Sequence, residues 1–143
     1  MERKCIMDKD TTMKLGLWLA EIQHIKHEWG KHDCCTLFVE WHDKRFGTNE
    51  LDKIYGKYND FKSGVRFSRD VWPMSRWKKW FKEKGYKQVT TPTTGDIVMV
   101  QNKFFPSSYI ICMNQAWSIL DDSKRMTKHV IEEPEAEYSI WRY

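Results

Sequence analysis

The sequence has no long apolar run and no strong excess of charge of one sign. No segment is apolar enough to span a bilayer, and the opening residues MERKCIMDKD are too charged for a signal peptide. The net charge of +4 is milder than that of dedicated nucleic-acid binders, so nucleic acid is not an expected partner. Repeats, linkers and low-complexity segments are absent as well. We therefore expect one domain over residues 1–143, made in a cytoplasm, with residues 1–11 as a flexible arm.

Cysteines are few, whereas aromatic residues are abundant. The four cysteines, two of which are adjacent, are expected to remain thiols, because neighbouring cysteines do not bridge easily and a cytoplasm is reducing. Aromatic residues make up 15% of the chain and include eight Trp. This content predicts a thick aromatic core, with further rings on surfaces that bury against partners.

Helical periodicity dominates the first half of the chain. Apolar residues at three-four spacing predict one helix from Thr12 to Trp29, ended by Gly30, and a central helix over residues 33–46 whose start Asp33 caps. Residues 50–72 have the composition of short helices and turns. The segment SRWKKWFKEKGY predicts a further helix, capped by Ser75, with Trp and Phe on one face and Lys on the others, which favours a core helix over a membrane or nucleic-acid surface.

The pattern changes after residue 90. Ile97–Val100 is a short apolar run of strand length, and SSYIICMN, AWSIL and SIWRY follow at hairpin distances. Because no strand alternates with a helix, the order predicts an α+β fold in which N-terminal helices pack on a small C-terminal antiparallel sheet.

The segment EWGKHDCCTLFVEW, residues 28–41, places two cysteines at a predicted helix start. A thiol there lies among unpaired backbone N–H groups and the positive end of the helix dipole, which favour a thiolate nucleophile. Such a nucleophile also needs a base, normally an oriented His. The alternative of a metal site formed by His24, His27, His32 and the cysteines is disfavoured, because adjacent cysteines on a helix diverge by about 100°. We expect no metal, no cofactor and solvated histidines.

These residues carry a resemblance to a known family. WGKHDCCTLFVEW, followed some sixty residues later by TGDIVMV and an aliphatic strand, resembles the NlpC-type cysteine peptidases, a rearranged branch of the papain-like fold. The likeness is closer to a phage-encoded subgroup with a WG-x-x-DCC motif and an ending similar to SIWRY. It covers roughly residues 13–143, and it implies a papain-like fold and a cysteine nucleophile.

Carried over by position, the resemblance implies that Cys34 is a vestigial nucleophile. Where the second core strand should begin with His, the chain has Ser107 and Ser108, of which Ser108 is taken for the usual His position. A hydroxyl cannot accept a proton as an imidazole does. The third site position falls near Trp117 and Ser118. His129 is a possible substitute base, provided that its strand lies beside the second core strand.

Two functions follow from the resemblance. The first is a structural or interaction protein of a phage particle, tail-associated, which contacts other phage structural proteins. The second is an active cysteine endopeptidase or amidase that cleaves peptides of peptidoglycan. The residues expected to make contacts are those that helical faces explain least, namely Trp72, Phe104, Phe105, Trp141 and Tyr143.

Overall fold

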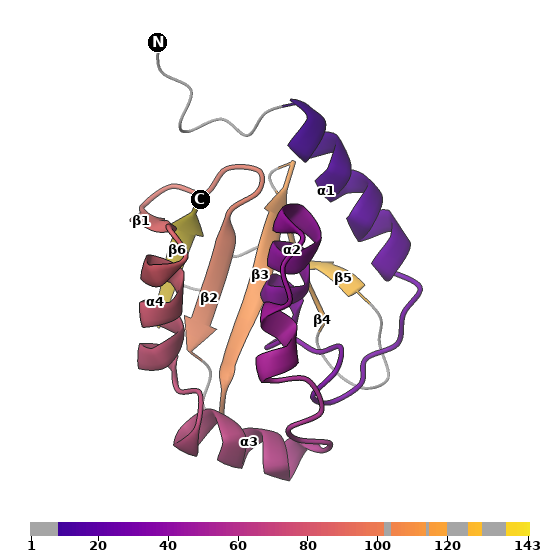
Figure 1. Ribbon diagram of the computed structural model, residues 1–143. Helices are drawn as coiled ribbons and strands as arrows, with labels where there is room; N and C mark the ends of the chain where they lie inside the picture. Colours follow the sequence, from indigo (N-terminus) through magenta and orange to yellow (C-terminus); the bar gives the residue numbers. More distant parts are fainter. Residues whose placement is uncertain (1–8, 102–103, 114, 120–125, 130–136) are drawn as a thin grey trace.

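The computed structural model describes residues 9–101, 104–113, 115–119, 126–129 and 137–143 (Figure 1). In the described residues, four α-helices and a short 3-10 helix precede the six strands, and all strand pairs are antiparallel. The helices are α1 (Lys9–Ile22), α2 (Leu37–Phe46), η1 (Glu50–Lys53), α3 (Phe61–Asp70) and α4 (Met74–Glu83). The strands are β1 (Lys87–Val89), β2 (Ile97–Gln101), β3 (Pro106–Cys112), β4 (Gln115–Ile119), β5 (Met126–His129) and β6 (Glu137–Arg142). The predicted α+β class is confirmed.

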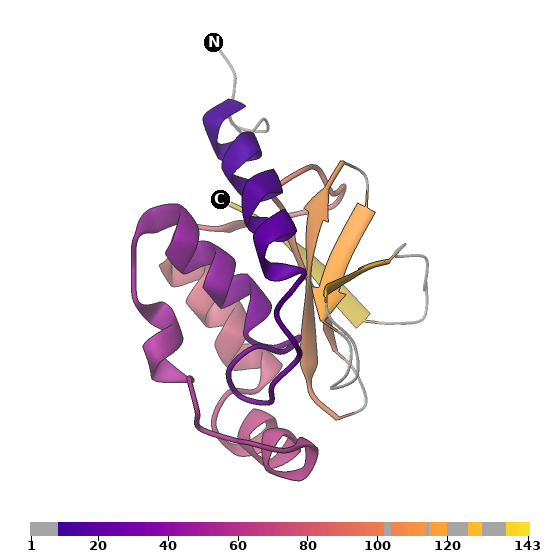
Figure 2. The same ribbon diagram turned by 90° about the vertical axis from the view of Figure 1, so that its right-hand side faces the viewer.

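One six-stranded sheet has the order β1-β6-β2-β3-β4-β5, and Figure 2 shows the helices gathered on one of its faces. Strands β2, β3, β4 and β6 were predicted, whereas the short β1 and β5 were not. Both lie at the edges of the sheet and contain polar residues, so the sequence carries no alternating apolar pattern there. Among the described helices, none is both long and apolar enough to cross a membrane.

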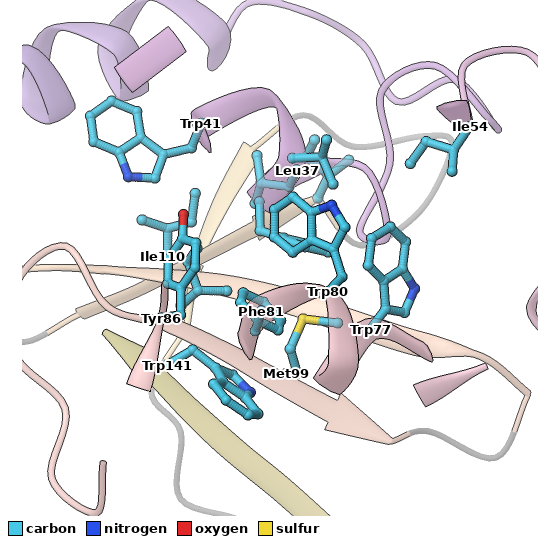
Figure 3. Packing of buried hydrophobic residues seen from close by; sticks show 14 of the residues in the cluster. Leu37, Trp41, Ile54, Trp77, Trp80, Phe81, Tyr86, Met99, Ile110 and Trp141 are labelled. Atoms are coloured by element: carbon cyan, nitrogen blue, oxygen red, sulfur yellow. The ribbon is translucent and has the colours of Figure 1, made fainter. Parts of the chain in front are cut away.

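The main core lies between the helices and the sheet, and aromatic rings fill much of it (Figure 3). Phe38 of α2 meets Trp77, Trp80 and Phe81 of α4 at ring-centroid distances of 4.8, 5.6 and 5.2 Å. Phe81 in turn stacks on Trp141 of β6, 4.9 Å away. Six of the eight Trp residues are buried, which confirms that the aromatic content chiefly builds the core. Because most of these rings are buried, fewer aromatic side chains are exposed for contacts with partners than the sequence suggested.

Helix α1 differs from its prediction at both ends. It begins at Lys9, so residues 9–11 of the expected arm are helical, while residues 1–8 lie outside the described part of the chain. It ends at Ile22 and not at Trp29, because the backbone of Glu28 pairs with His32 in a tight hairpin, with N···O distances of 2.9 and 2.8 Å. Ile25, predicted to lie on the buried face, is 46% exposed.

Two further helix starts differ from the sequence prediction. Helix α2 begins at Leu37, and residues 33–36 form the turn that leads into it, with the Asp33 carbonyl accepting from the amides of Thr36 and Leu37. Helix α4 begins at Met74 with Pro73 at the N-cap, so Ser75 does not cap it. The fixed φ of proline prepares the first turn, and the Pro73 carbonyl accepts the amides of Arg76 and Trp77.

Candidate cysteine site

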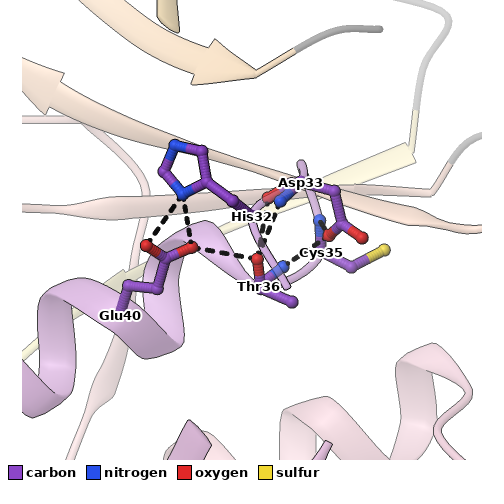
Figure 4. A network of polar contacts seen from close by, with 5 residues as sticks. All are labelled: His32, Asp33, Cys35, Thr36 and Glu40. Carbon is purple, nitrogen blue, oxygen red and sulfur yellow. Dashed lines mark hydrogen bonds and ion pairs between the residues drawn. The ribbon is translucent and has the colours of Figure 1, made fainter. Parts of the chain in front are cut away.

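The carboxylate of Asp33 organises the turn that presents the two cysteines (Figure 4). One oxygen accepts the backbone amides of Cys35 and Thr36, at 2.8 and 2.9 Å. The other accepts the amide of Gly30 and the hydroxyl of Tyr58, at 2.8 and 2.7 Å. Asp33 therefore accepts nearby backbone amides as predicted, but it does so in the turn before α2, whose N-cap is Thr36. It also ties the Trp-Gly turn and the segment after η1 to the same point.

Gly30 allows this turn to close. Its φ is +81°, and a Cβ at this position would come within 2.0 Å of the Tyr58 carbonyl oxygen. The Gly30 carbonyl accepts the amide of Gly56 at 2.9 Å. Only glycine meets both the backbone conformation and the close approach, which explains the Trp-Gly pair in structural terms.

Cys34 lies in the turn before α2 and is held against β3. Its carbonyl accepts both the amide and the hydroxyl of Ser108, each at 2.7 Å, so that this turn pairs with the edge of β3. Its sulfur receives a hydrogen bond from the Ser107 hydroxyl, with an Oγ···Sγ distance of 3.4 Å. Only 4% of Cys34 is exposed. The structure thus brings the predicted nucleophile and the predicted strand together.

Ser107, and not Ser108, lies at the thiol. Ser108, which the resemblance assigns to the usual His position, donates its hydroxyl to the Cys34 carbonyl and not to the sulfur. The Ser108 carbonyl accepts the hydroxyl of Ser118 on β4 at 2.7 Å. Ser108 and Ser118 therefore join β4, β3 and the cysteine turn, which is a structural role for buried hydroxyls.

The second cysteine has a different environment. The thiol of Cys35 donates to the Pro106 carbonyl, with an Sγ···O distance of 2.7 Å. A hydrogen bond with Cys34, burial, and electrostatic interactions with Cys34 and Asp33 raise the pKa of Cys35. A buried thiol with a raised pKa is a poor nucleophile, so Cys35 acts in packing and in anchoring the start of β3.

Histidine side chains near the cysteines are directed to other partners. The Nδ1 atom of His32 lies 2.9 Å from a carboxylate oxygen of Glu40, whose other oxygen accepts the Thr36 hydroxyl at 3.0 Å. Burial raises the pKa of Glu40. The ring of His27 is buried against Trp29, 4.7 Å between centroids. Both were expected to be solvated, and both are instead buried by the hairpin at Glu28 to His32.

Two hypotheses remain to be compared with the structure: His129 as a substitute base, and a metal site formed by histidines and cysteines. His129 is on β5, which pairs with β4, so β4 separates it from β3 and the required neighbour relation is not met. Within the ranges that the structure describes, no group of three or more His, Cys, Asp or Glu side chains is arranged to hold a metal.

The Gly-Asp motif and the chain end meet in one ion pair. Asp96 precedes β2 and is almost fully buried, and it receives two hydrogen bonds from the Arg142 guanidinium, at 3.0 and 2.8 Å. Its carboxylate also accepts the Thr93 amide at 2.8 Å. The motifs TGD and WRY lie far apart in the sequence. The ion pair between Asp96 and Arg142 links them and so connects the start of β2 to the end of β6.

An exposed aromatic patch lies beside the cysteine turn and consists of Trp29, Phe61, Phe104 and Phe105. Phe61 lies 5.7, 5.4 and 5.8 Å from Trp29, Phe104 and Phe105, measured between ring centroids. Phe61 is 44% exposed and Phe104 is 49% exposed. The patch continues into Pro106 and Ser107, which contact the two cysteines. Trp29 and Phe61 were not predicted, since only the folded loop brings them to Phe104.

The other predicted contact residues differ in their exposure. Trp72 and Trp141 are buried, which overturns their assignment to a contact surface. Trp72 stacks on Trp77 at 4.1 Å, and the indole N–H of Trp141 donates to Ser139 on its own strand. Tyr143 is exposed and lies 4.5 Å from Phe46. Of the predicted set, Phe104, Phe105 and Tyr143 therefore remain available for contacts.

The comparison with protein families gives one result for this chain. The family model described as a domain of unknown function (DUF6950) matches residues 8–140. The chain belongs to this family. No curated protein matches it. The matched range contains the cysteine turn, the aromatic patch and Asp96, so these features all lie within the DUF6950 domain.

Proposed function

We propose that the chain is a non-catalytic interaction protein of a bacteriophage particle, associated with the tail and built on an NlpC-type papain-like scaffold. The observation that carries the proposal is the hydrogen bond from Ser107 to the Cys34 sulfur, because the resemblance implies an imidazole beside the thiol in an active peptidase. A serine hydroxyl does not accept a proton near neutral pH, so this pair cannot generate the thiolate and imidazolium of a cysteine peptidase.

The scaffold part of the proposal rests on the arrangement around Cys34. A cysteine in the turn that leads into α2, packed against β3 of an antiparallel sheet, is close to the placement that the resemblance implies. The polar groups around it are used structurally: Asp33 holds the amides of this turn, and Ser108 and Ser118 connect the turn, β3 and β4. A site whose hydrogen-bonding groups serve the fold is what is expected of a retained but inactive peptidase domain.

The interaction part of the proposal rests on the aromatic patch. Phe61 and Phe104 expose large apolar rings close together, and aromatic residues are enriched where protein surfaces bury one another. The expected partners are other structural proteins of the particle, made with it in the bacterial host cytoplasm.

An active cysteine endopeptidase or amidase acting on peptidoglycan is the second candidate. It is favoured by the position of Cys34 in the turn that leads into α2 and against β3, because the resemblance implies a nucleophile there. In that case the aromatic patch would hold substrate beside the thiol and not a neighbouring subunit.

Mass spectrometry of purified virions tests the proposal directly, and we expect the chain in the particle. Replacing Phe104 and Phe105 together by Ala should reduce its incorporation, whereas Tyr138→Ala, an exposed aromatic on β6 outside the patch, should not. Cys34→Ser should leave incorporation and infectivity unchanged. Loss of wall cleavage or infectivity by Cys34→Ser in normally assembled particles would establish the enzyme instead.

A further inference from the structure

An open pocket of about 680 Å³ lies between η1 and α4, and none of its residues belongs to the cysteine site or the aromatic patch. Its volume is within the range of small-molecule sites in proteins. The residues around it are Lys53, Trp72, Ser75, Arg76, Lys79, Trp80, Glu83 and Lys84. We call it the α4 pocket.

Cationic side chains from two elements converge on the α4 pocket. Three Lys and one Arg line it against one carboxylate, that of Glu83. Lys79 is exposed on α4 and has no ion pair among the described residues, so its ammonium is available to a ligand. The excess of positive charge in a concave surface attracts an anion.

Two of these lysines are held in place by a carboxylate behind the pocket wall. Glu50 of η1 lies 2.8 Å from the Lys53 ammonium and 3.1 Å from that of Lys84, and it accepts the indole N–H of Trp80 at 3.0 Å. Because Glu50 is anchored to a buried Trp, both ammonium groups are positioned before any ligand arrives. Less side-chain entropy is then lost on binding.

Arg76 is also fixed by two contacts. Its guanidinium lies over the Trp72 ring, 3.9 Å from the centroid, and its Nη1 atom donates to the Val71 carbonyl at 2.7 Å. This bond uses one of the five N–H groups of the guanidinium. Its remaining N–H groups can still donate to a tetrahedral oxyanion.

We propose that the α4 pocket binds the phosphate group of a small phosphorylated ligand. Lysines dominate the cations, and they bind phosphate as point charges without the planar geometry that a carboxylate prefers. When Glu50 and Glu83 are both counted against the four cations, a net charge of +2 remains, which matches a phosphate dianion. The pocket thus adds a ligand site to the proposed interaction protein and does not depend on that function.

Quenching of tryptophan fluorescence tests this site, because two Trp residues form its wall. Inorganic pyrophosphate and inorganic phosphate are titrated into the full chain at low salt, where screening is weak. We expect saturable binding of both. Lys79→Glu should weaken it ~10-fold or more, since it reverses an unpaired charge in the pocket. Lys82→Glu is the matched control, with the same charge change on α4 outside the pocket, and it should have less than about a twofold effect.

Each other outcome would overturn the proposal. If Lys79→Glu and Lys82→Glu weaken pyrophosphate binding equally, the attraction is a non-specific one to a basic helix. If citrate binds as tightly as pyrophosphate, the pocket is a general anion-binding surface. Tighter binding of a short single-stranded oligonucleotide than of pyrophosphate would assign the pocket to a polymer. No saturable quenching by pyrophosphate, confirmed by calorimetry, would exclude a phosphate site.

Discussion

Replacing Asp33 by Ala should destabilise this protein more than the loss of an ordinary helix cap. The Asp33 side chain is fully buried and accepts four hydrogen bonds, from the amides of Gly30, Cys35 and Thr36 and from the Tyr58 hydroxyl. A hydrogen bond to a charged group contributes about 1.5–3 kcal/mol, and a buried donor left without a partner has a cost of similar size. Because the turn can relax and admit water, these contributions do not add fully. We expect a loss of about 3–5 kcal/mol in the free energy of unfolding.

Urea unfolding followed by tryptophan fluorescence measures this loss. For a domain of this size, 1 kcal/mol corresponds to about 3 °C in Tm, so Asp33→Ala should lower Tm by about 10–15 °C. Asp33→Asn keeps one carbonyl oxygen but directs an NH2 group at two donors. It should cost about 2–3 kcal/mol, between wild type and the Ala variant.

Asp60 provides the matched control, because it caps α3 from an exposed position. Its carboxylate accepts the Ser63 amide at 2.7 Å, and Asp60→Ala should lower the stability to urea much less than Asp33→Ala does. If both Ala variants cost the same, or if Asp33→Ala stays within about 1 kcal/mol of wild type, the reasoning on the buried carboxylate is refuted.

Three further predictions concern charge and the thiol. Arg142→Ala should cost about 3–5 kcal/mol in urea unfolding, because it leaves the buried Asp96 carboxylate unpaired. Ser107→His should speed alkylation of Cys34 by iodoacetamide at pH 6, since an imidazolium at that position stabilises the thiolate. Hydrogen bonds from its Lys and Trp partners outweigh the effect of partial burial and lower the pKa of Glu50 to about 2. This contribution to stability is complete above pH about 4.5 and is lost towards pH 2, and Glu50→Gln should remove that loss.

Matched variants separate these effects from general damage to the fold. Arg69 pairs with Asp70 on an exposed surface, and Arg69→Ala should cost less than about 1 kcal/mol. Ser108→His should destabilise the protein without speeding alkylation, because the Ser108 hydroxyl holds the Cys34 carbonyl. Unchanged alkylation by a folded Ser107→His variant would contradict the inferred position of the thiol. An unchanged pH profile for Glu50→Gln would contradict the inferred ion pairs.

Much of the fold could be predicted from local patterns. The three-four spacing of Trp77, Trp80 and Phe81 identifies the buried face of α4, and the apolar run Ile97–Val100 identifies β2. The end of α1 could not be predicted in this way. The periodicity continues to Trp29, but the hairpin at Glu28 supplies better backbone partners than another helical turn.

In the candidate site, too, some features could be predicted from the sequence and others could not. Local sequence patterns placed Cys34 close to a helix start, and the resemblance implied that a serine of the second core strand lies beside it. The structure brings the Ser107 hydroxyl to the sulfur and the Ser108 hydroxyl to the Cys34 carbonyl, a division that depends on how the cysteine turn pairs with the edge of β3. Tyr58, a partner of the Asp33 carboxylate, was not predicted, because nothing in its local sequence indicates that contact.

The sequence by itself determined the α+β class, which follows from the order of helical and strand patterns, and the role of Asp33 as an acceptor for backbone amides close to it in the chain. Only the tertiary structure decided which rings are buried. Trp72 and Trp141 are buried in the core, whereas Phe104 contacts Phe61 and both rings are exposed. Burial depends on which elements meet in space, and residues far apart in the chain carry no local signal of that meeting.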